Sequence, residues 1–186
     1  MKLAEVYKKS LKKKWLVRLK TKYPDNGAYN GVVLKETKDF VVLCVEYDLE
    51  WNGMLILAKK FISGFRDGKF EKTLNAILHH SGQIRKVSLP KWLVKCETFE
   101  DVFKNCLKRK VWPCVEILFK ERKLKSAFFV GKVINGNENQ VFFQSYDATG
   151  EWEKEWVIEF KEILSVGFND SYTTHFNAFM RAKDKK

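Results

Sequence analysis

The sequence contains an internal repeat. EVYKKSLKKKW at residues 5–15 returns as DVFKNCLKRKVW at residues 101–112. Further matches follow in the same order: Trp15 with Trp112, VRL (17–19) with VEI (115–117), GVVL (31–34) with GKVI (131–134), FVVLCVEYD (40–48) with QVFFQSYDA (140–148), Trp51 with Trp152, and ISGF (62–65) with ILSV (163–166). One match would mean little, but ordered matches at similar spacing predict that one structural unit is present twice.

Each copy begins and ends with a predicted helix. Leu3, Val6, Tyr7 and Leu11 recur at steps of three and four residues, which places them on one helical face. The second copy begins with Thr98 as a predicted N-cap, in a capping box with Asp101. The closing helices carry the apolar sets Phe70, Leu74, Ile77 and Leu78, and Tyr172, Phe176, Phe179 and Met180.

Between the two helices, each copy reads as five short strands. WLVRLK at 15–20 alternates apolar and basic residues, which is typical of a half-buried strand. YPDNG at 23–27 predicts the turn that follows. Later segments are rich in β-branched and aromatic residues, as strands are. We therefore expect the order helix, five strands, helix in both copies.

Five antiparallel strands in about 80 residues must hide their edges, and this favours a small barrel. The predicted fold class is α+β, with two tandem small five-stranded antiparallel β-barrels, each flanked by short helices. Residues 1–80 would form the first helix-plus-barrel repeat, and residues 98–186 the second, with a basic tail. Residues 81–97 would be a linker packed on the repeats, because apolar side chains such as Ile84, Leu89 and Trp92 recur in it.

The order of a helix and five bent strands resembles the Sm-like small barrel, which is close to the SH3-like barrels. The resemblance rests on Gly31 and Gly131, each of which opens a second strand and is followed by a polar turn and an apolar strand that ends in an acidic residue. It implies the barrel fold for residues 1–80 and 98–181.

Sm-like RNA binders also carry an Asp-aromatic-x-Asn element and an Arg/Lys-Gly pair. The corresponding segments here are ETKDF (36–40), NGNENQ (135–140), AKKF (58–61) and EFKEI (159–163). By this resemblance Asn137 or Asn139 would stand for the base-reading asparagine, and Lys59 or Lys60 for the basic element. The Arg/Lys-Gly pair is absent, so the resemblance carries over the fold and not a uridine pocket.

The charge balance favours a polyanionic partner. The chain has 35 Lys and Arg against 23 Asp and Glu, a formal net charge of +12, and residues 1–22 alone hold nine bases and one acid. The competing interpretation is that the lysine-rich helix faces are merely solvated. The predicted nucleic-acid-binding residues are Lys8, Lys9, Lys12, Lys13, Arg18, Lys20, Lys104, Lys108 and Arg109.

Catalytic and metal-binding motifs are missing from the sequence. The four cysteines form no C-x-x-C pair and lie in apolar surroundings, which favours reduced core thiols over disulfides. His79 and His80 are adjacent and diverge on a helix, so no metal site or cofactor is predicted. Asp48 and Asp147 each precede a turn and are interpreted as turn residues. Since no catalytic fingerprint appears, we do not expect an enzyme.

The sequence leaves two main hypotheses open. The first is a non-catalytic binding protein that engages nucleic acid, RNA or a single strand, through its basic surface. The alternative is a protein–protein interaction adaptor or accessory protein that uses barrel edges or the segment VSLPKWLV (87–94). Membrane binding through the first helix is a weaker third hypothesis. No apolar run approaches the ~20 residues of a membrane span, and no secretory signal is visible, so we expect a cytoplasmic protein.

Overall fold

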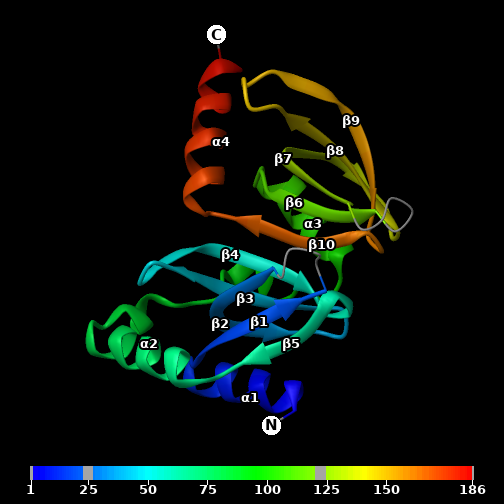
Figure 1. Ribbon diagram of the computed structural model, residues 1–186. Coiled ribbons are helices and arrows are strands. Elements are labelled where there is room, and N and C mark those ends of the chain that lie inside the picture. Colours follow the sequence, from blue (N-terminus) through cyan, green and yellow to red (C-terminus); the bar gives the residue numbers. More distant parts are fainter. Residues whose placement is uncertain (1, 23–26, 120–124, 186) are drawn as a thin grey trace. The chain divides into compact units, whose positions relative to one another are not determined.

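The computed structural model describes residues 2–22, 27–119 and 125–185. The chain divides into two compact units, Met1–Val94 (unit 1) and Lys95–Lys186 (unit 2), and the boundary falls inside the predicted linker. Both units have the order helix, five strands, helix (Figure 1). Most of the predicted turn at 23–27 lies outside the described residues.

The elements of unit 1 are α1 (Leu3–Lys13), β1 (Leu16–Thr21), β2 (Ala28–Glu36), β3 (Phe40–Tyr47), β4 (Glu50–Ala58), a 3-10 turn (Lys59–Phe61), β5 (Ile62–Arg66) and α2 (Lys69–His80), with two further 3-10 turns at Gln83–Lys86 and Lys91–Leu93. The elements of unit 2 are α3 (Phe99–Arg109), β6 (Cys114–Phe119), β7 (Lys125–Gly136), β8 (Gln140–Tyr146), β9 (Trp152–Glu159), β10 (Ile163–Phe168) and α4 (Ser171–Lys183).

The prediction of two closed barrels is wrong. In unit 1 the strands lie in the order β5-β1-β2-β3-β4, and in unit 2 in the order β10-β6-β7-β8-β9. These sheets are antiparallel and open: β4 and β5 lie at opposite ends of their order, as do β9 and β10, and no register between described residues joins either pair.

Helices cover the sheet that we expected to close on itself. In unit 1, Leu16 and Val32 share a buried cluster with Leu74 and Leu78 of α2. On β2, the next residue along, Val33, donates its backbone N–H to the Ser10 hydroxyl of α1 over 2.8 Å. Because a packed helix supplies a second layer, closure is not needed to bury the sheet.

The two units share the irregularities of their sheets. The β2–β3 register shifts between Val33 and Lys35, and the β7–β8 register shifts between Val133 and Asn135, 100 residues later. A second shift lies between Cys44 and Glu46 in unit 1 and between Gln144 and Tyr146 in unit 2. Residues 31–46 therefore correspond structurally to residues 131–146.

The first strands correspond differently from the sequence match. Leu19 pairs with Tyr29, and Val115 pairs with Phe129, so Leu19 is equivalent to Val115 rather than to Ile117. Helices α1 and α3 both end at a lysine in the left-handed conformation, Lys14 and Lys110. Two residues after these lysines stand Leu16 and Trp112, which are therefore equivalent. The sequence match had instead paired Trp112 with Trp15 because both are tryptophans, and this pairing is one residue out of register.

An asparagine fixes each closing helix to the first strand of its unit. In unit 1, Asn75 of α2 accepts a hydrogen bond from the Leu16 N–H (2.9 Å) and donates to the Leu16 carbonyl (3.0 Å). In unit 2, Asn177 of α4 donates to the carbonyl of the equivalent residue, Trp112, over 2.8 Å. The same amide contact therefore positions α2 and α4.

The predicted linker contributes to unit 1. Ile84 and Val87 belong to the core cluster under α2. Lys35 donates its ammonium to the carbonyls of Leu93 (3.3 Å) and Val94 (2.7 Å). Residues 84–94 are thus part of the unit 1 fold.

The four cysteines are free thiols, and burial raises the pKa of Cys44, Cys106 and Cys114 to about 12. Within the described ranges, no group of His, Cys, Asp and Glu side chains is arranged to hold a metal ion. Over the same ranges, no helix has the length and apolar character needed to cross a membrane.

Candidate functional site

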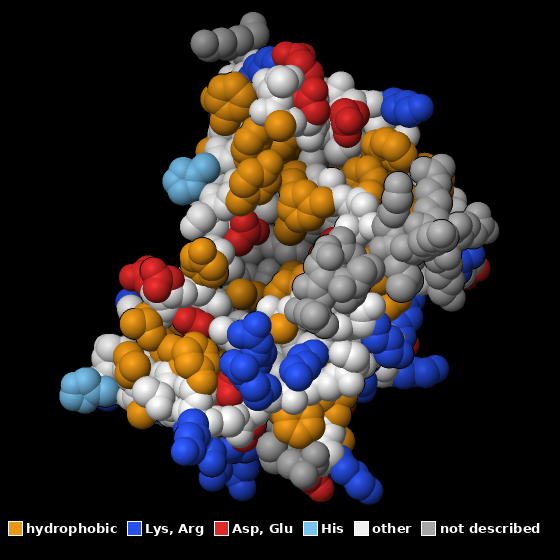
Figure 2. Space-filling view, viewed as in Figure 1, with side chains coloured by type: hydrophobic (Ala, Val, Ile, Leu, Met, Phe, Trp, Pro, Cys, Tyr) orange, Lys and Arg blue, Asp and Glu red, His pale blue; other side chains and the backbone are white. Residues whose placement is uncertain are grey.

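The basic residues of α1 lie on its outward face. Val6, Tyr7 and Ser10 form the buried face of this helix. Lys8 and Lys12 are one turn apart on the opposite side, and both are exposed. Neither forms an ion pair with a carboxylate of the part of the chain that the structure describes. Figure 2 shows Lys and Arg side chains on the surface of this unit. These two lysines are therefore available to an anionic partner.

Lys9 has a structural role instead. Its ammonium pairs with Asp67 at 2.7 Å and lies 4.0 Å from the centre of the Trp15 ring. The Trp15 indole N–H also donates to Asp67, over 3.0 Å. Burial alone raises the pKa of Asp67, but the hydrogen bonds from Lys9 and Trp15 outweigh it and hold that pKa below its usual value. Lys9 thus ties α1 to the segment after β5.

The basic residues of α3 are partly neutralised. Lys104 and Lys108 are equivalent to Lys8 and Lys12. Lys104 pairs with Glu100 at 2.6 Å, and this contact raises the pKa of Lys104. The equivalent of Glu100 in α1 is Ala4, which leaves Lys8 without such a partner. The repeated lysine pair is therefore free of carboxylates in unit 1 only.

The nine predicted residues are divided between the two units and, within unit 1, between two separate faces. Lys8, Lys12 and Lys13 are exposed on α1, and Lys108 and Arg109 are exposed on α3 in the other unit. Arg18 and Lys20 come two and four residues after Leu16 on β1, so they share its face of the sheet, which is the face toward α2. They do not extend the basic face of α1.

Arg18 belongs to a polar row that crosses three strands of unit 1. It lies directly opposite Asn30 on β2, and the Asn30 side chain in turn contacts Glu46 on β3. The equivalent positions in unit 2 carry Cys114, Val130 and Tyr146, of which Val130 and Tyr146 are buried in a cluster with Met180. Unit 1 thus has polar side chains where unit 2 has core.

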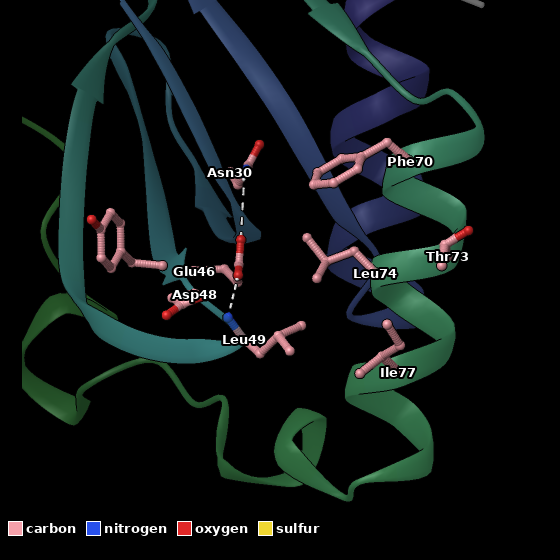
Figure 3. A pocket seen from close by; sticks show the side chains of 9 residues that line it. Asn30, Glu46, Asp48, Leu49, Phe70, Thr73, Leu74 and Ile77 are labelled. Carbon is pink, nitrogen blue, oxygen red and sulfur yellow. Dashed lines mark hydrogen bonds between the residues drawn. The ribbon is translucent and has the colours of Figure 1, made fainter.

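Glu46 is the most enclosed member of this polar row, with 7% of its surface exposed. Its carboxylate accepts hydrogen bonds from the Leu49 N–H (2.7 Å) and, more weakly, from the Asn30 amide (3.4 Å). Figure 3 shows both contacts and the open space between β3 and α2. Among the described residues, no lysine or arginine forms an ion pair with Glu46.

A pocket of about 660 Å³ lies over Glu46. Phe70, Leu74 and Ile77 project into it from α2, as Figure 3 shows. Phe70 is 56% exposed and Ile77 42% exposed, and hydrophobic side chains gather over α2 in Figure 2. The pocket therefore combines an apolar wall with a buried carboxylate at its floor, which is the usual composition of a ligand site.

The turn at the mouth of the pocket is strained. Asp48 and Leu49, between β3 and β4, both have positive φ, at 51° and 67°. Asparagine, aspartate and glycine tolerate this conformation, but leucine rarely adopts it. The hydrogen bond from the Leu49 N–H to Glu46 stabilises the turn. Strained residues of this kind cluster at binding sites.

Aromatic side chains fill the corresponding place in unit 2. Tyr146 stacks on Phe176 of α4 with the ring centres 5.2 Å apart, and it contacts Trp152 edge-on at 5.7 Å. Its hydroxyl donates to Asn177 over 2.9 Å. The pocket is thus a feature in which the two units differ.

Asn30 and Glu46 are not among the site residues predicted from the sequence. The sequence match set Asp48 against Asp147, and so Tyr47 against Tyr146, whereas the strand registers make Glu46 the equivalent of Tyr146. That Glu46 lies under α2 follows only from the folded structure. The interpretation of Asp147 as a turn residue is confirmed, because its carboxylate accepts hydrogen bonds from the Thr149 and Glu151 N–H groups.

No family model matches the chain, and comparisons with curated proteins and with solved structures also give no match. The resemblance to Sm-like barrels therefore stays a prediction from the sequence. Both sites in unit 1, the basic face of α1 and the pocket under α2, rest on the geometry of this chain.

Proposed function

We propose that this protein binds nucleic acid and that the outward face of α1 makes the main contacts to phosphate. The observation that carries the proposal is the pair Lys8 and Lys12, exposed one turn apart with no carboxylate partner among the described residues. Lys13 is exposed beside them at the end of the helix. Lysine ammonium groups held on a rigid helix attract phosphate oxygens without reading base sequence.

The charge of the whole chain supports the same proposal. A net charge of +12 speeds the approach of a polyanion, and the contacts themselves release counterions from it. The alternative of a protein–protein adaptor has less support at its predicted segment, VSLPKWLV. Val87 and Leu93 of that segment are buried and Leu89 and Trp92 are half-buried, so Val94 is its exposed apolar residue.

The proposal is tested by replacing Lys8 and Lys12 together with glutamine. Fluorescence anisotropy would measure the affinity for a labelled single-stranded oligonucleotide, RNA or DNA, over a range of salt concentrations. Removing two phosphate contacts should weaken binding at low salt by tenfold or more. It should also reduce the slope of log K against log salt by about 1.4, since each contact to a single strand contributes about 0.7.

The matched control is the double variant Lys104→Gln/Lys108→Gln, which removes the same charge from the equivalent positions of α3. We expect it to change affinity much less, because Glu100 already neutralises Lys104. Equal losses in the two double variants would show that only net charge matters. No binding of the wild-type protein to any RNA or DNA oligomer at low salt would overturn the proposal.

A further inference from the structure

We infer that the pocket under α2 is a binding site for an organic cation, a primary ammonium or guanidinium group carried on an apolar chain. Glu46 would hold the cationic group, and the apolar side chains of α2 would cover the chain. This site is separate from the phosphate-binding face proposed on α1, and neither proposal depends on the other.

The first argument is the state of Glu46. A buried carboxylate is costly unless a cation or several hydrogen bonds compensate it. Glu46 has one short hydrogen bond, from the Leu49 N–H, and one long one, from Asn30. Carboxylate oxygens can accept about four hydrogen bonds in all, so capacity remains on the pocket side. An ammonium or guanidinium group would fill it with charge-assisted hydrogen bonds.

The second argument is the Asn30 side chain beside Glu46. Its Nδ2 is directed at Glu46, while its Oδ1 is buried and has no hydrogen-bond donor. An unsatisfied buried acceptor is rare in a folded protein. Asn30 and Glu46 therefore have acceptor capacity that lacks donors among the described residues, which is the deficiency that a bound cation corrects.

The third argument is the sign of the charge and the shape of the pocket. Its charged lining residues are Glu46 and Asp48, and no lysine or arginine is among the described residues that line it. Anions are thus disfavoured. Phe70, Leu74 and Ile77 provide an apolar wall beside the carboxylate, so a bare metal ion would leave that wall uncovered. A volume of about 660 Å³ lies within the range of small-molecule sites and leaves room for an amine with its apolar chain.

The fourth argument is the comparison with unit 2. There the position of Glu46 is occupied by Tyr146, which packs against Phe176 and Trp152. The same backbone framework can therefore fill this space with its own side chains. In unit 1 it instead leaves the space open over a charged group.

The first experiment compares four probes of equal length with the wild-type protein: hexylamine, hexylguanidine, hexanol and hexanoate. Backbone amide NMR would follow their binding. We expect the two cations to shift the signals of Leu49, Leu74 and Ile77 and to bind at least tenfold more tightly than hexanol. Hexanoate should not bind. Equal binding of the amine and the alcohol, or no binding of either cation, would overturn the inference.

The second experiment replaces Glu46 with glutamine, which keeps the shape and removes the charge. Hexylamine affinity should fall at least tenfold. The matched control is Glu50→Gln, because Glu50 is exposed on β4 and does not line the pocket. Unchanged affinity in Glu46→Gln would contradict the inference. Should that variant fail to fold, the selectivity of the wild-type protein between amine and alcohol still decides the question.

Two sources could present this cation, a free amine or a lysine side chain of a protein. The peptide acetyl-Leu-Lys-Leu-amide would be compared with hexylamine and with the same peptide carrying norleucine in place of lysine. Tighter binding of the lysine peptide than of hexylamine would identify a protein side chain as the source. Tighter binding of hexylamine would identify a small amine. The Lys8→Gln/Lys12→Gln variant should bind hexylamine normally, which separates a failure of this inference from a failure of the proposed function.

Discussion

At the scale of single residues, Gly31 and Gly131 were singled out from the sequence, but as the first residues of their strands. They lie instead within β2 and β7, and each lies against the backbone of the third strand of its unit. A Cβ atom on Gly31 would lie 2.5 Å from the Cys44 carbonyl oxygen, and a Cβ on Gly131 would overlap the Gln144 carbonyl oxygen. Only glycine fits such an approach of two backbones.

Gly131→Ala should therefore lower the free energy of unfolding of unit 2 by about 1–3 kcal/mol, because the new methyl group forces the strands apart. Urea denaturation followed by tryptophan fluorescence would measure the loss. Gly64→Ala is the matched control: nothing lies within 4 Å of a Cβ at that strand position. A variant Gly131→Ala as stable as Gly64→Ala would show that the strands can separate at no cost.

Among other single residues, a local capping motif was predicted correctly and two pocket residues were missed. The capping box of Thr98 and Asp101 is confirmed, with the Asp101 N–H donating to the Thr98 hydroxyl over 3.1 Å. This contact is local in sequence, so a short motif suffices to predict it. Glu46 and Asn30 were missed because their importance comes from residues on α2, more than 20 positions further along the chain. Residue type alone does not carry that information.

At the scale of elements, the helices and strands were predictable, but their packing was not. Apolar periodicity indicated a helix, five strands and a helix in each copy, and both units have that order. The closing helix was not recognised as a cover for the sheet, so a barrel was expected in its place. The feature that docks the helix is one buried asparagine, Asn75, and a polar residue on a helix ordinarily suggests an exposed position.

Replacing Asn75 with leucine should destabilise unit 1 by about 2–4 kcal/mol. The variant leaves the N–H and the carbonyl of Leu16 buried without partners at the start of β1. Thermal or urea unfolding would report the loss. Ala76→Leu, at the next and exposed position of α2, should have almost no effect. Similar stabilities for the two variants would mean that α2 is held by its apolar contacts alone.

At the scale of the whole molecule, the chain has an excess of positive charge, and several of its carboxylates have defined partners. In unit 1, Glu71 is buried and accepts hydrogen bonds from Arg66 (2.6 Å) and from the Gly68 N–H (2.7 Å). Burial raises the pKa of Glu71, but these contacts outweigh it and lower the pKa overall. Asp67 follows the same pattern with Lys9 and Trp15.

These lowered pKa values predict a loss of stability in acid. A carboxyl group whose pKa is lower in the folded than in the unfolded chain stabilises the folded state above its ordinary pKa. That contribution should be complete above about pH 5 and should disappear as the pH falls below about 4. Urea midpoints measured between pH 3 and pH 7 would test this. The variant Glu71→Gln should be less stable at pH 7 and should show a shallower pH dependence than the wild-type protein.

The contrast between the polar row of unit 1 and the aromatic packing of unit 2 has a consequence for engineering and for divergence. At equivalent backbone positions, each unit shows a side chain that the other unit could also carry. Replacing Glu46 with tyrosine would fill the proposed ligand pocket and make unit 1 more rigid. Replacing Tyr146 with glutamate would open a second pocket in unit 2. A duplicated scaffold of this kind can specialise one half for recognition while the other preserves the architecture.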